Sequence, residues 1–407
     1  MIKVLWFINT PSLAASELGI KVFSGGWLSA LDTALQDRVE LHVAFHFPKR
    51  INVIKKGRTM YYPLTLKNDR IRLLFNNYFG LNIKQNISSL EKKYSDLIKD
   101  INPDIIHIHG TENTFGFVFN VTKIPVVLTI QGFVSAVVAK SLLYNNWKYS
   151  KDLAVKIRRY KYLSMLEMNT IRNAKYIISK SNWSDLVINS LNMDATLFHQ
   201  NNILKKEFYL NIWQPKKAHL GEWVITTVLG ESVIKGLDII FKTLMLLKDL
   251  SIKIRWQIIG IDSESKLLKY FSYKSKYKEI HRCIELKGKL GVNELINCLM
   301  NTDIYVMTSR IENSPNNLSE ALLMGIPCIS TNVGGVSSYI EEDVTGIMVP
   351  DGDQFAIAGA IVKYINNYEW AIKLGATARK KSLERHRVDY LADIQLEIYN
   401  DILKAQE

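Results

Sequence analysis

Short apolar runs alternate with longer amphipathic segments along the 407-residue chain. Most of the runs are continuously apolar, which is typical of strands buried on both faces of a parallel sheet. In the first half we expect strands at 2–8, 39–47, 104–109, 125–130, 176–179 and 192–198. In the second half we expect them at 223–229, 254–259, 283–286, 304–307, 327–330 and 346–349. Helical segments between consecutive strands favour the α/β class.

The alternation starts anew in the second half, and a chain of 407 residues is long for one core. We therefore expect two doubly wound, Rossmann-like parallel-sheet domains facing one cleft, at 1–205 and 222–386. Residues 206–221 are expected to form the linker, and 387–407 a further helix at the C-terminus. No G-x-G-x-x-G follows the first strand, which argues against a nicotinamide enzyme.

The strand at 304–307 leads into a helix whose two ends are marked in the sequence. Ser314 is a good N-cap, and Pro315 suits the first helical position because its missing N–H would be unpaired there. Gly325 then ends the helix. Apolar residues at i, i+3 and i+4 predict its buried face, and these are Leu318, Ala321 and Leu322.

Two carboxylates, Glu312 and Glu320, flank the mouth of this helix. Backbone N–H groups and the helix dipole make a helix N-terminus an anion site. Carboxylates repel phosphate, so they are better suited to accept hydrogen bonds from hydroxyl groups beside it. Phosphate and hydroxyls together suggest a sugar nucleotide. The alternative is a surface helix with two solvated glutamates, and spacing alone does not choose between the two interpretations.

Glu312, seven residues and then Glu320 resemble the E-x7-E motif of retaining glycosyltransferases of family 4, the glycosyl transferases group 1. The flanking segments 309–316, 320–327 and 332–336 resemble the same family. The resemblance implies the GT-B fold and a C-terminal helix that crosses back to the first domain. It implies that Glu320 holds the nucleotide ribose and that Glu312 contacts the donor sugar. Amides between them, at Ser314, Asn316 and Asn317, would hold the diphosphate.

Further donor-site residues are expected in other loops. Lys235 would project a cation into a phosphate site, and its Lys-Gly-Leu-Asp segment resembles the one that neutralises the diphosphate in the family. Gly25 and Gly26 resemble the glycine pair of the family's first loop. Gly288 lies in a segment that resembles the base pocket, and Arg310 is a second cation near the diphosphate.

Two positions depart from the family's pattern. Gln131 stands where histidine is common, so this side chain can donate and accept hydrogen bonds but cannot act as a general base. Glu231 stands where many members have arginine. A metal site is not expected, because the Asp351-x-Asp353 pair follows a strand and Pro350 and therefore predicts a turn.

A candidate acceptor loop follows the strand that ends at His109, with Thr111 and Glu112 next in the chain. His107 and His109 share one face of that strand. They are either satisfied core imidazoles or part of a site at the carboxyl end of the strand, where α/β sites form. A zinc site would need a third ligand, which the neighbouring sequence does not offer.

The net charge of +13 is uneven. Residues 1–200 contain 26 Lys and Arg against 14 Asp and Glu, whereas residues 201–407 contain 26 against 25. Eight of the basic residues fall within 49–72, among them Lys55, Lys56 and Arg58, and Tyr61 and Tyr62 lie between them. This pattern suits peripheral contact with an anionic membrane surface. A solvated basic loop and a general basic background are the alternatives. No zinc finger, Arg-Gly repeat or RNA-binding signature points to nucleic acid.

The three cysteines, Cys283, Cys298 and Cys328, have no paired spacing, and no signal peptide or run of eighteen apolar residues is evident. We expect a cytoplasmic protein at the inner face of the membrane. The predicted activity is retaining transfer from a nucleotide-diphosphate sugar to a lipid-linked saccharide in surface polysaccharide synthesis, with no metal or other cofactor. The alternatives are a non-catalytic GT-B scaffold and a sugar-nucleotide epimerase of the same fold.

Overall fold

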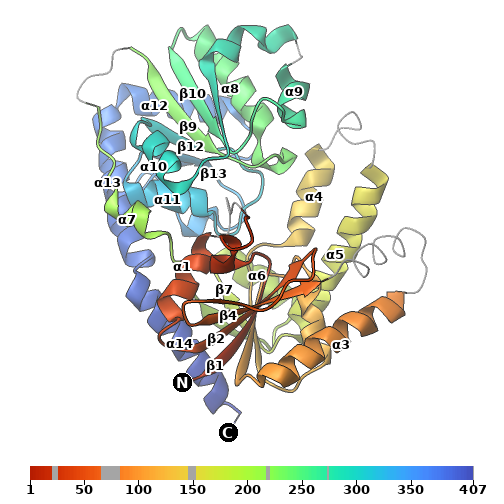
Figure 1. The fold of residues 1–407 in the computed structure, drawn as a ribbon. Helices are drawn as coiled ribbons and strands as arrows, with labels where there is room; N and C mark the ends of the chain where they lie inside the picture. The colour runs from red at the N-terminus through yellow and green to blue at the C-terminus, as the bar shows by residue number, and fades with distance from the viewer. Residues whose placement is uncertain (21–25, 66–82, 145–152, 217–220, 273–274, 407) are drawn as a thin grey trace. The chain divides into compact units, whose positions relative to one another are not determined.

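The computed structural model describes residues 1–20, 26–65, 83–144, 153–216, 221–272 and 275–406. Contacts divide the chain into two compact units (Figure 1). Unit 1 comprises Met1–Ala139, Asp152–Ile203 and Arg387–Glu407. Unit 2 comprises Lys140–Lys151 and Leu204–His386. Each is described by itself below. Gly25 and the basic residues Lys67, Arg70 and Arg72 lie outside the described residues.

Unit 1 contains an eight-stranded sheet with the order β3-β4-β2-β1-β5-β6-β7-β8, parallel except for β3. Its strands are β1 (Lys3–Ile8), β2 (Glu40–Phe47), β3 (Ile54–Lys56), β4 (Thr59–Thr65), β5 (Ile105–His109), β6 (Val126–Thr129), β7 (Tyr176–Ser179) and β8 (Thr196–His199). The helices include η1 (Ser12–Ala15), α1 (Gly26–Leu35), α3 (Ile83–Ile101), η2 (Thr114–Asn120), α4 (Val134–Tyr144), α5 (Leu153–Asn173), α6 (Asn182–Leu191) and α14 (Val388–Lys404).

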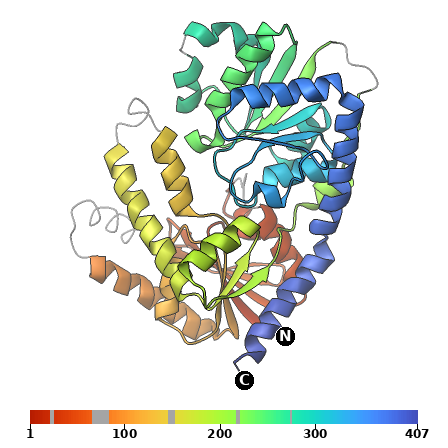
Figure 2. The same cartoon turned by 180° about the vertical axis from the view of Figure 1, so that it is seen from behind.

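Alternate residues of β1 enter two separate cores, as expected for a strand buried on both faces. Val4, Trp6 and Ile8 pack with α1 and α14, whereas Leu5 and Phe7 pack with α3 and η2. The C-terminal helix α14 belongs to this unit, and both chain ends lie close together in it (Figures 1 and 2).

Unit 2 contains a parallel six-stranded sheet with the order β11-β10-β9-β12-β13-β14. Its strands are β9 (Trp223–Val228), β10 (Ile254–Ile259), β11 (Ile284–Gly288), β12 (Ile304–Met307), β13 (Cys328–Thr331) and β14 (Ile347–Val349). Its helices include α7 (Lys206–Leu210), η4 (Val233–Lys235), α8 (Leu237–Asp249), α9 (Lys266–Ser272), η5 (Ser275–Cys283), α10 (Val292–Met300), α11 (Asn316–Met324), η6 (Val336–Ser338), α12 (Gln354–Asn366) and α13 (Tyr368–Arg385).

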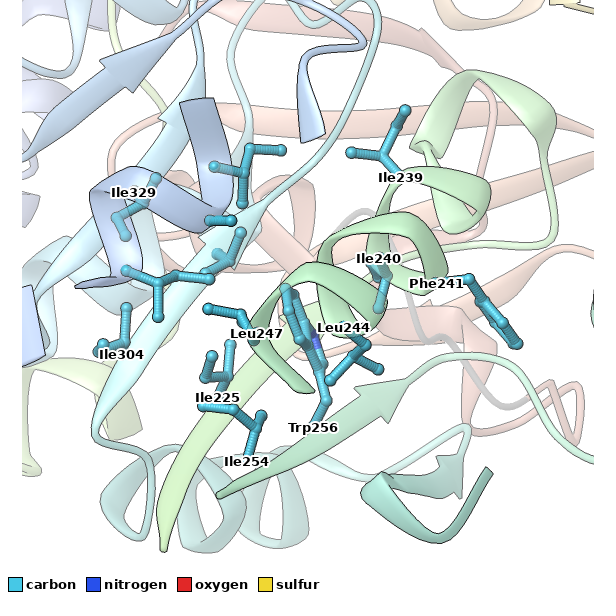
Figure 3. Close-up of a cluster of buried hydrophobic side chains, with 14 of the residues drawn as sticks. Ile225, Ile239, Ile240, Phe241, Leu244, Leu247, Ile254, Trp256, Ile304 and Ile329 are labelled. Carbon is cyan, nitrogen blue, oxygen red and sulfur yellow. The ribbon is translucent and has the colours of Figure 1, made fainter. Parts of the chain in front are cut away.

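Two cores cover the faces of this sheet as well. Trp256 of β10 packs among Ile225, Leu244 and Leu247 on the face covered by α8 (Figure 3). Its indole N–H donates to Thr227 Oγ1 at 3.0 Å, so the one polar atom of this large side chain is satisfied. The opposite face packs against α7, α10 and α11. The predicted α/β class, with two parallel-sheet units, is confirmed.

Two local predictions are corrected by the structure, and a third is refined. The helix α11 begins at Asn316, with Pro315 as its N-cap, and Ser314 Oγ instead accepts a hydrogen bond from the Tyr339 hydroxyl at 2.7 Å. The segment expected as a linker contains the helix α7, because Phe208 and Trp213 are buried in unit 2. The turn predicted at Asp351-x-Asp353 is present at residues 351–352, and Asp353 after it is the N-cap of α12, whose carboxylate accepts from two backbone N–H groups.

The segment predicted to contact a membrane is described as far as residue 65. Residues 54–65 form the hairpin β3–β4, in which Tyr61 is fully buried and donates to the Asp32 carboxylate. Tyr61 therefore belongs to the core of unit 1 and cannot contact a membrane. Within the described ranges, no helix is both long and apolar enough to cross a bilayer.

Candidate functional site

The strand order of unit 2 reverses between the neighbouring strands β9 and β12. The connection after β9 leads to β10 on one side, and the connection after β12 leads to β13 on the other. In doubly wound sheets, ligands bind outside the carboxyl ends of the strands at this topological switch point. The loop that carries Lys235 follows β9, and the loop that carries Glu312 follows β12. Both lie at the place where the topology favours a ligand.

Lys235 and Glu312 meet there in an ion pair between Nζ and Oε1. The two residues are separated by 77 positions in the chain, so the strand order brings them together. The Lys235 side chain keeps 26% of its surface exposed and the Glu312 side chain 13%. The pair is therefore shielded enough to be strong, yet open to an incoming anion.

Backbone contacts fix the two loops against each other. Gly236 has the left-handed conformation (φ 73°), and a Cβ atom there would lie 2.0 Å from the Thr308 carbonyl oxygen. Thr308 Oγ1 donates to the Lys235 carbonyl at 2.9 Å, and the Arg310 N–H donates to the Ile234 carbonyl at 2.7 Å. Only glycine allows this close approach.

Arg310 is buried, with 2% of its side chain exposed, and does not present its charge to solvent. Its guanidinium donates to both carboxylate oxygens of Asp238, at 2.7 and 2.9 Å, and to the Val233 carbonyl at 2.6 Å. These bonds hold the turn that precedes α8. Arg310 therefore positions Lys235, and the expected direct role of Arg310 at a diphosphate is not supported.

The first turns of α11 carry the other predicted residues. Asn317 Nδ2 donates to the Val228 carbonyl at 2.8 Å, which ties the start of the helix to the end of β9. Asn316 is the first residue of the helix and is half-buried. Glu320 is half-buried one turn further on, and burial raises the pKa of its carboxyl to about 8, with a smaller opposing effect of Lys205.

Two further positions complete the description of unit 2. Glu231 Oε1 accepts from the Lys266 N–H at 2.7 Å and from Ser265 Oγ at 3.0 Å. An acidic residue at the start of α9 complements the helix dipole, which explains why a carboxylate stands at this position. Gly288 is the last residue of β11 (φ 64°), and its carbonyl accepts from the Gly260 N–H at 2.6 Å.

Unit 1 has its own switch point, between β1 and β5. Asn9, which follows β1, donates to Glu112 Oε2 at 2.8 Å, and Asn113 donates to Asn9 Oδ1. Burial raises the pKa of the Glu112 carboxyl, while the bond from Asn9 partly offsets that effect. Glu112 and Asn113 are half-buried and reach the surface, so this loop can meet a ligand.

The other two predicted acceptor residues are buried. Thr111 Oγ1 donates to the carboxylate of Glu167 at 2.9 Å, and that carboxylate also accepts the Val134 and Ser135 N–H groups at the start of α4. His109 is fully buried, with its ring stacked on His107 at 3.7 Å between centroids. Neither side chain is exposed to solvent, so Glu112 is the predicted acceptor residue that a ligand can reach.

His107 is a satisfied core imidazole. Its Nδ1 lies 2.7 Å from the Tyr399 hydroxyl of α14, and its Nε2 lies 2.6 Å from Thr129 Oγ1. Trp6 also donates to the Tyr399 hydroxyl, at 2.9 Å. Burial holds the pKa of both His107 and His109 well below the ordinary value, so both rings are neutral.

In the part of the chain that the structure describes, no cluster of three His, Cys, Asp or Glu side chains is arranged to hold a metal ion.

Lys180, at the carboxyl end of β7, is a residue that sequence reasoning did not single out. It is 4% exposed, its Nζ lies 3.6 Å from the centre of the Trp27 ring, and it donates to Asn202. Burial lowers the pKa of Lys180 to about 7, with Glu112 opposing that shift. The sequence signal that could have identified Lys180 is a lysine directly after a predicted strand.

Of the remaining predicted residues, Gly26 begins α1 and Gln131 is half-buried after β6.

Comparison with known proteins agrees with the geometry of unit 2. Residues 213–381 match the model of the family described as glycosyl transferases group 1. The whole chain superposes on sucrose-phosphate synthase from Thermosynechococcus elongatus with a TM-score of 0.77, 15% identity and full coverage of both chains. It also superposes on HepE from Anabaena, solved in complex with UDP-glucose, with a TM-score of 0.67, 13% identity and coverage of 100% and 99%. These matches support the group 1 superfamily and the GT-B fold.

Sequence relatives match shorter stretches. The putative colanic acid biosynthesis glycosyltransferase WcaL of Escherichia coli K12 is 26% identical over 157 residues, which are 37% of this chain and 38% of that protein. The alignments with the first three curated relatives cover 27%, 38% and 46% of those proteins. The chain therefore spans less than half of each of these relatives.

Proposed function

We propose that this protein is a retaining glycosyltransferase of family 4 that uses a nucleotide-diphosphate sugar. The observation that carries the proposal is the Lys235–Glu312 ion pair at the switch point of unit 2, directly before the N-terminus of α11. The match of residues 213–381 to the group 1 family supports it. HepE, which has the same fold, was solved with UDP-glucose, and this supports a nucleotide sugar as the donor class.

The chemistry follows from the charges. When the donor binds, its diphosphate takes the place of Glu312 as the partner of Lys235, and the α11 amides bind the phosphate oxygens. Glu312 is then released to accept a hydrogen bond from a donor sugar hydroxyl. Negative charge grows on the leaving diphosphate oxygen, so the cation stabilises the transition state more than the ground state. The leaving phosphate assists attack from the same face of the sugar, which retains the anomeric configuration.

Lys235 and the helix amides supply the charge neutralisation, so we propose that transfer does not require a metal ion. The acceptor is proposed to be a lipid-linked saccharide in surface polysaccharide synthesis, bound by unit 1 through the Glu112 loop. The name of the relative WcaL, from colanic acid biosynthesis, supports a polysaccharide pathway. The hydrogen bonds of Glu231 at the start of α9 weaken the alternative of a non-catalytic scaffold, since this departure from the family has a structural cause.

The test is donor hydrolysis by the full chain across UDP-, GDP- and ADP-sugars, with and without EDTA. We expect one nucleotide to be preferred, with α-configured sugar released from an α-linked donor, and activity to persist in EDTA. Hydrolysis of none of the donors would contradict the proposed activity. Release of the inverted anomer would contradict retention, and loss of activity in EDTA would contradict the metal-free mechanism.

We further propose that unit 1 binds the anionic inner face of the membrane reversibly through the hairpin β3–β4 and the segment before it. Lys49, Arg50 and Lys55 are exposed there, whereas Lys56 pairs with Glu17 and Arg58 with Asp37. Each basic residue near an anionic surface contributes about 1 kcal/mol. Co-sedimentation with anionic and neutral vesicles should show salt-sensitive binding that is lost when Lys49, Arg50 and Lys55 are neutralised. Equal binding by that variant would rule out this surface.

A further inference from the structure

A second candidate site lies in unit 1, in a pocket of about 220 Å³ between η2 and the C-terminal half of α5. None of the described residues that line it is charged. Its polar groups are the side-chain amides of four asparagines and the hydroxyls of two threonines, namely Asn113, Asn120, Asn169, Asn173, Thr114 and Thr170. Nothing in the donor site or in the Glu112 loop requires such a pocket.

The fold builds the pocket from one face of α5. Residues 166, 169, 170 and 173 recur at i, i+3, i+4 and i+7, so they lie along one side of the helix. Gly116 of η2 lies so close that a Cβ atom there would be 2.0 Å from Thr170 Oγ1. This close approach forms the floor of the pocket, while Asn169 and Asn173 stand exposed at its edge. The half-buried ring of Phe117 is an apolar part of the wall.

The pocket is continuous with the Glu112 loop through one residue. Asn113 lines the pocket and also donates to Asn9, which in turn donates to Glu112 Oε2 at 2.8 Å. A ligand that reaches Glu112 with one end can therefore extend along η2 into the pocket.

The chemistry of the lining identifies the class of ligand. Amide and hydroxyl groups both donate and accept, which matches the hydroxyl groups of a sugar. Four of the six polar side chains also bond within the unit, namely Asn113, Asn120, Thr114 and Thr170. The exposed amides of Asn169 and Asn173 are therefore the groups best placed to meet a ligand. A phosphate or a sugar acid would call for a cation, and the lining residues provide none. The volume is below the roughly 300–1,000 Å³ of pockets for drug-sized ligands, so it fits about one sugar residue.

We propose that this pocket binds a neutral sugar residue of the acceptor glycan, set back from the end that receives the new sugar. The assignment rests on the proposed glycosyltransferase function, which supplies the acceptor. It adds a specificity site to unit 1: acceptors long enough to fill the pocket bind more tightly than shorter ones. A charged sugar at the same position gains no such advantage.

The experiment measures saccharide binding by the full chain with saturation-transfer NMR and titration. The probes are maltotetraose, mannotetraose and chitotetraose as neutral chains, and tetragalacturonate as an acidic one. We expect binding of a neutral probe that weakens about five- to tenfold in Asn169→Ala/Asn173→Ala. Asn189→Ala, an exposed asparagine on α6 of the same unit, is the matched control and should bind like wild type. All three substituted positions are exposed, and circular dichroism verifies folding.

Two results would overturn the assignment: no neutral probe binds wild type, or the double variant binds it unchanged. Preference for tetragalacturonate would overturn the neutral class. Donor hydrolysis by each variant separates this proposal from the proposed function. If the double variant loses saccharide binding but the protein cleaves no nucleotide sugar, the result supports saccharide binding in the pocket and contradicts the proposed transferase function. If donors are cleaved but the double variant binds saccharide as tightly as wild type, the result contradicts saccharide binding in the pocket and supports the transferase function.

Discussion

The two switch points have a similar strand topology but differ in the charge and exposure of the side chains beside them. In unit 2, the loops after β9 and β12 place a lysine and a glutamate in an ion pair that keeps contact with solvent. In unit 1, the strands β1 and β5 end beside two neutral, buried imidazoles and the buried Lys180. The sheet determines where a ligand can bind. The exposure of the charged groups determines which ligand each place can bind, and among the described residues at the two switch points the partly exposed cation is Lys235 of unit 2.

The same contrast appears in how tightly each site is packed. Gly236 in unit 2 faces a backbone carbonyl that cannot move alone, whereas Gly110 in unit 1 faces the Glu112 side chain, which can rotate. The loops after β9 and β12 are thus held against each other by backbone contacts, whereas the loop after β5 is held by side chains.

The largest effect is expected for stability at these glycines. Gly236→Ala forces a positive φ and a Cβ atom 2.0 Å from the Thr308 carbonyl, and should cost about 3 kcal/mol. Gly110→Ala has a positive φ but meets only the side chains of Glu112 and Asn9, which can move, and should cost about 1 kcal/mol. Urea unfolding followed by tryptophan fluorescence compares the two variants. Equal destabilisation by Gly236→Ala and Gly110→Ala would contradict the claim that the loop at Gly236 is held more rigidly than the loop at Gly110.

The next effect concerns the ion pair. Lys235→Ala removes a charge-assisted contact worth roughly 1.5–3 kcal/mol, so kcat/KM for transfer should fall about 10- to 150-fold. Lys248→Ala is the matched control, since this lysine also lies on α8 but pairs with the exposed Glu279, away from Asp238 and Arg310. Its removal should leave kcat/KM within about twofold. Unchanged turnover in Lys235→Ala would mean that Lys235 does not act on the donor.

The two glutamates of unit 2 should separate by role. Glu320→Ala should mainly weaken nucleotide binding, because the ribose is bound in the ground and transition states alike. Glu312→Ala should mainly lower kcat, because this side chain faces the reacting sugar. Titration with the nucleoside diphosphate and steady-state kinetics distinguish the two, with the exposed Glu264→Ala as control. Equal nucleotide affinity in wild type and Glu320→Ala would refute the ribose assignment.

The smallest effects are opposite pH dependences of stability in the two units. Glu320 has a folded pKa of about 8, above its ordinary value of 4.5, so folding favours its protonated form. Its contribution to stability is complete below about pH 4.5 and is lost as the pH rises through 8. Lys180 has a folded pKa of about 7, below 10.5, so its burial costs stability below pH 7 and ceases to do so above 10.5.

Neutral substitutions should therefore act at opposite ends of the pH range. Glu320→Gln should stabilise the protein by roughly 1–2 kcal/mol at pH 9 and by little at pH 4.5, after allowance for its partial exposure. Lys180→Met should stabilise by a similar amount, about 1–2 kcal/mol, at pH 6 and by little at pH 10.5. Thermal unfolding across pH tests both. If the stability of both variants changed with pH in the same direction, burial would not be the main cause of the shifted pKa values of Glu320 and Lys180.

Much of the fold could be predicted from the sequence because its signals are local. Continuous apolar runs located the strands β9, β10 and β12 within a residue of their observed bounds, since a strand buried on both faces needs apolar residues throughout. Gly325 ended α11 as expected, because its left-handed conformation (φ 89°) suits the residue after a helix. Glu312, Glu320 and Lys235 became candidates because the E-x7-E spacing and the Lys-Gly-Leu-Asp segment, which are both local patterns, resemble those of a known family.

Only the tertiary structure decided how these residues are used. Strand order brings Lys235 to Glu312 across 77 residues, and no local pattern encodes which loops of a sheet become neighbours. Burial turned Arg310 into the partner of Asp238 and Tyr61 into a core residue, although both resemble surface groups in the sequence. The pocket between η2 and α5 is invisible in the sequence for the same reason. Periodicity reports which side of a segment is buried, whereas the partner on that side depends on long-range packing.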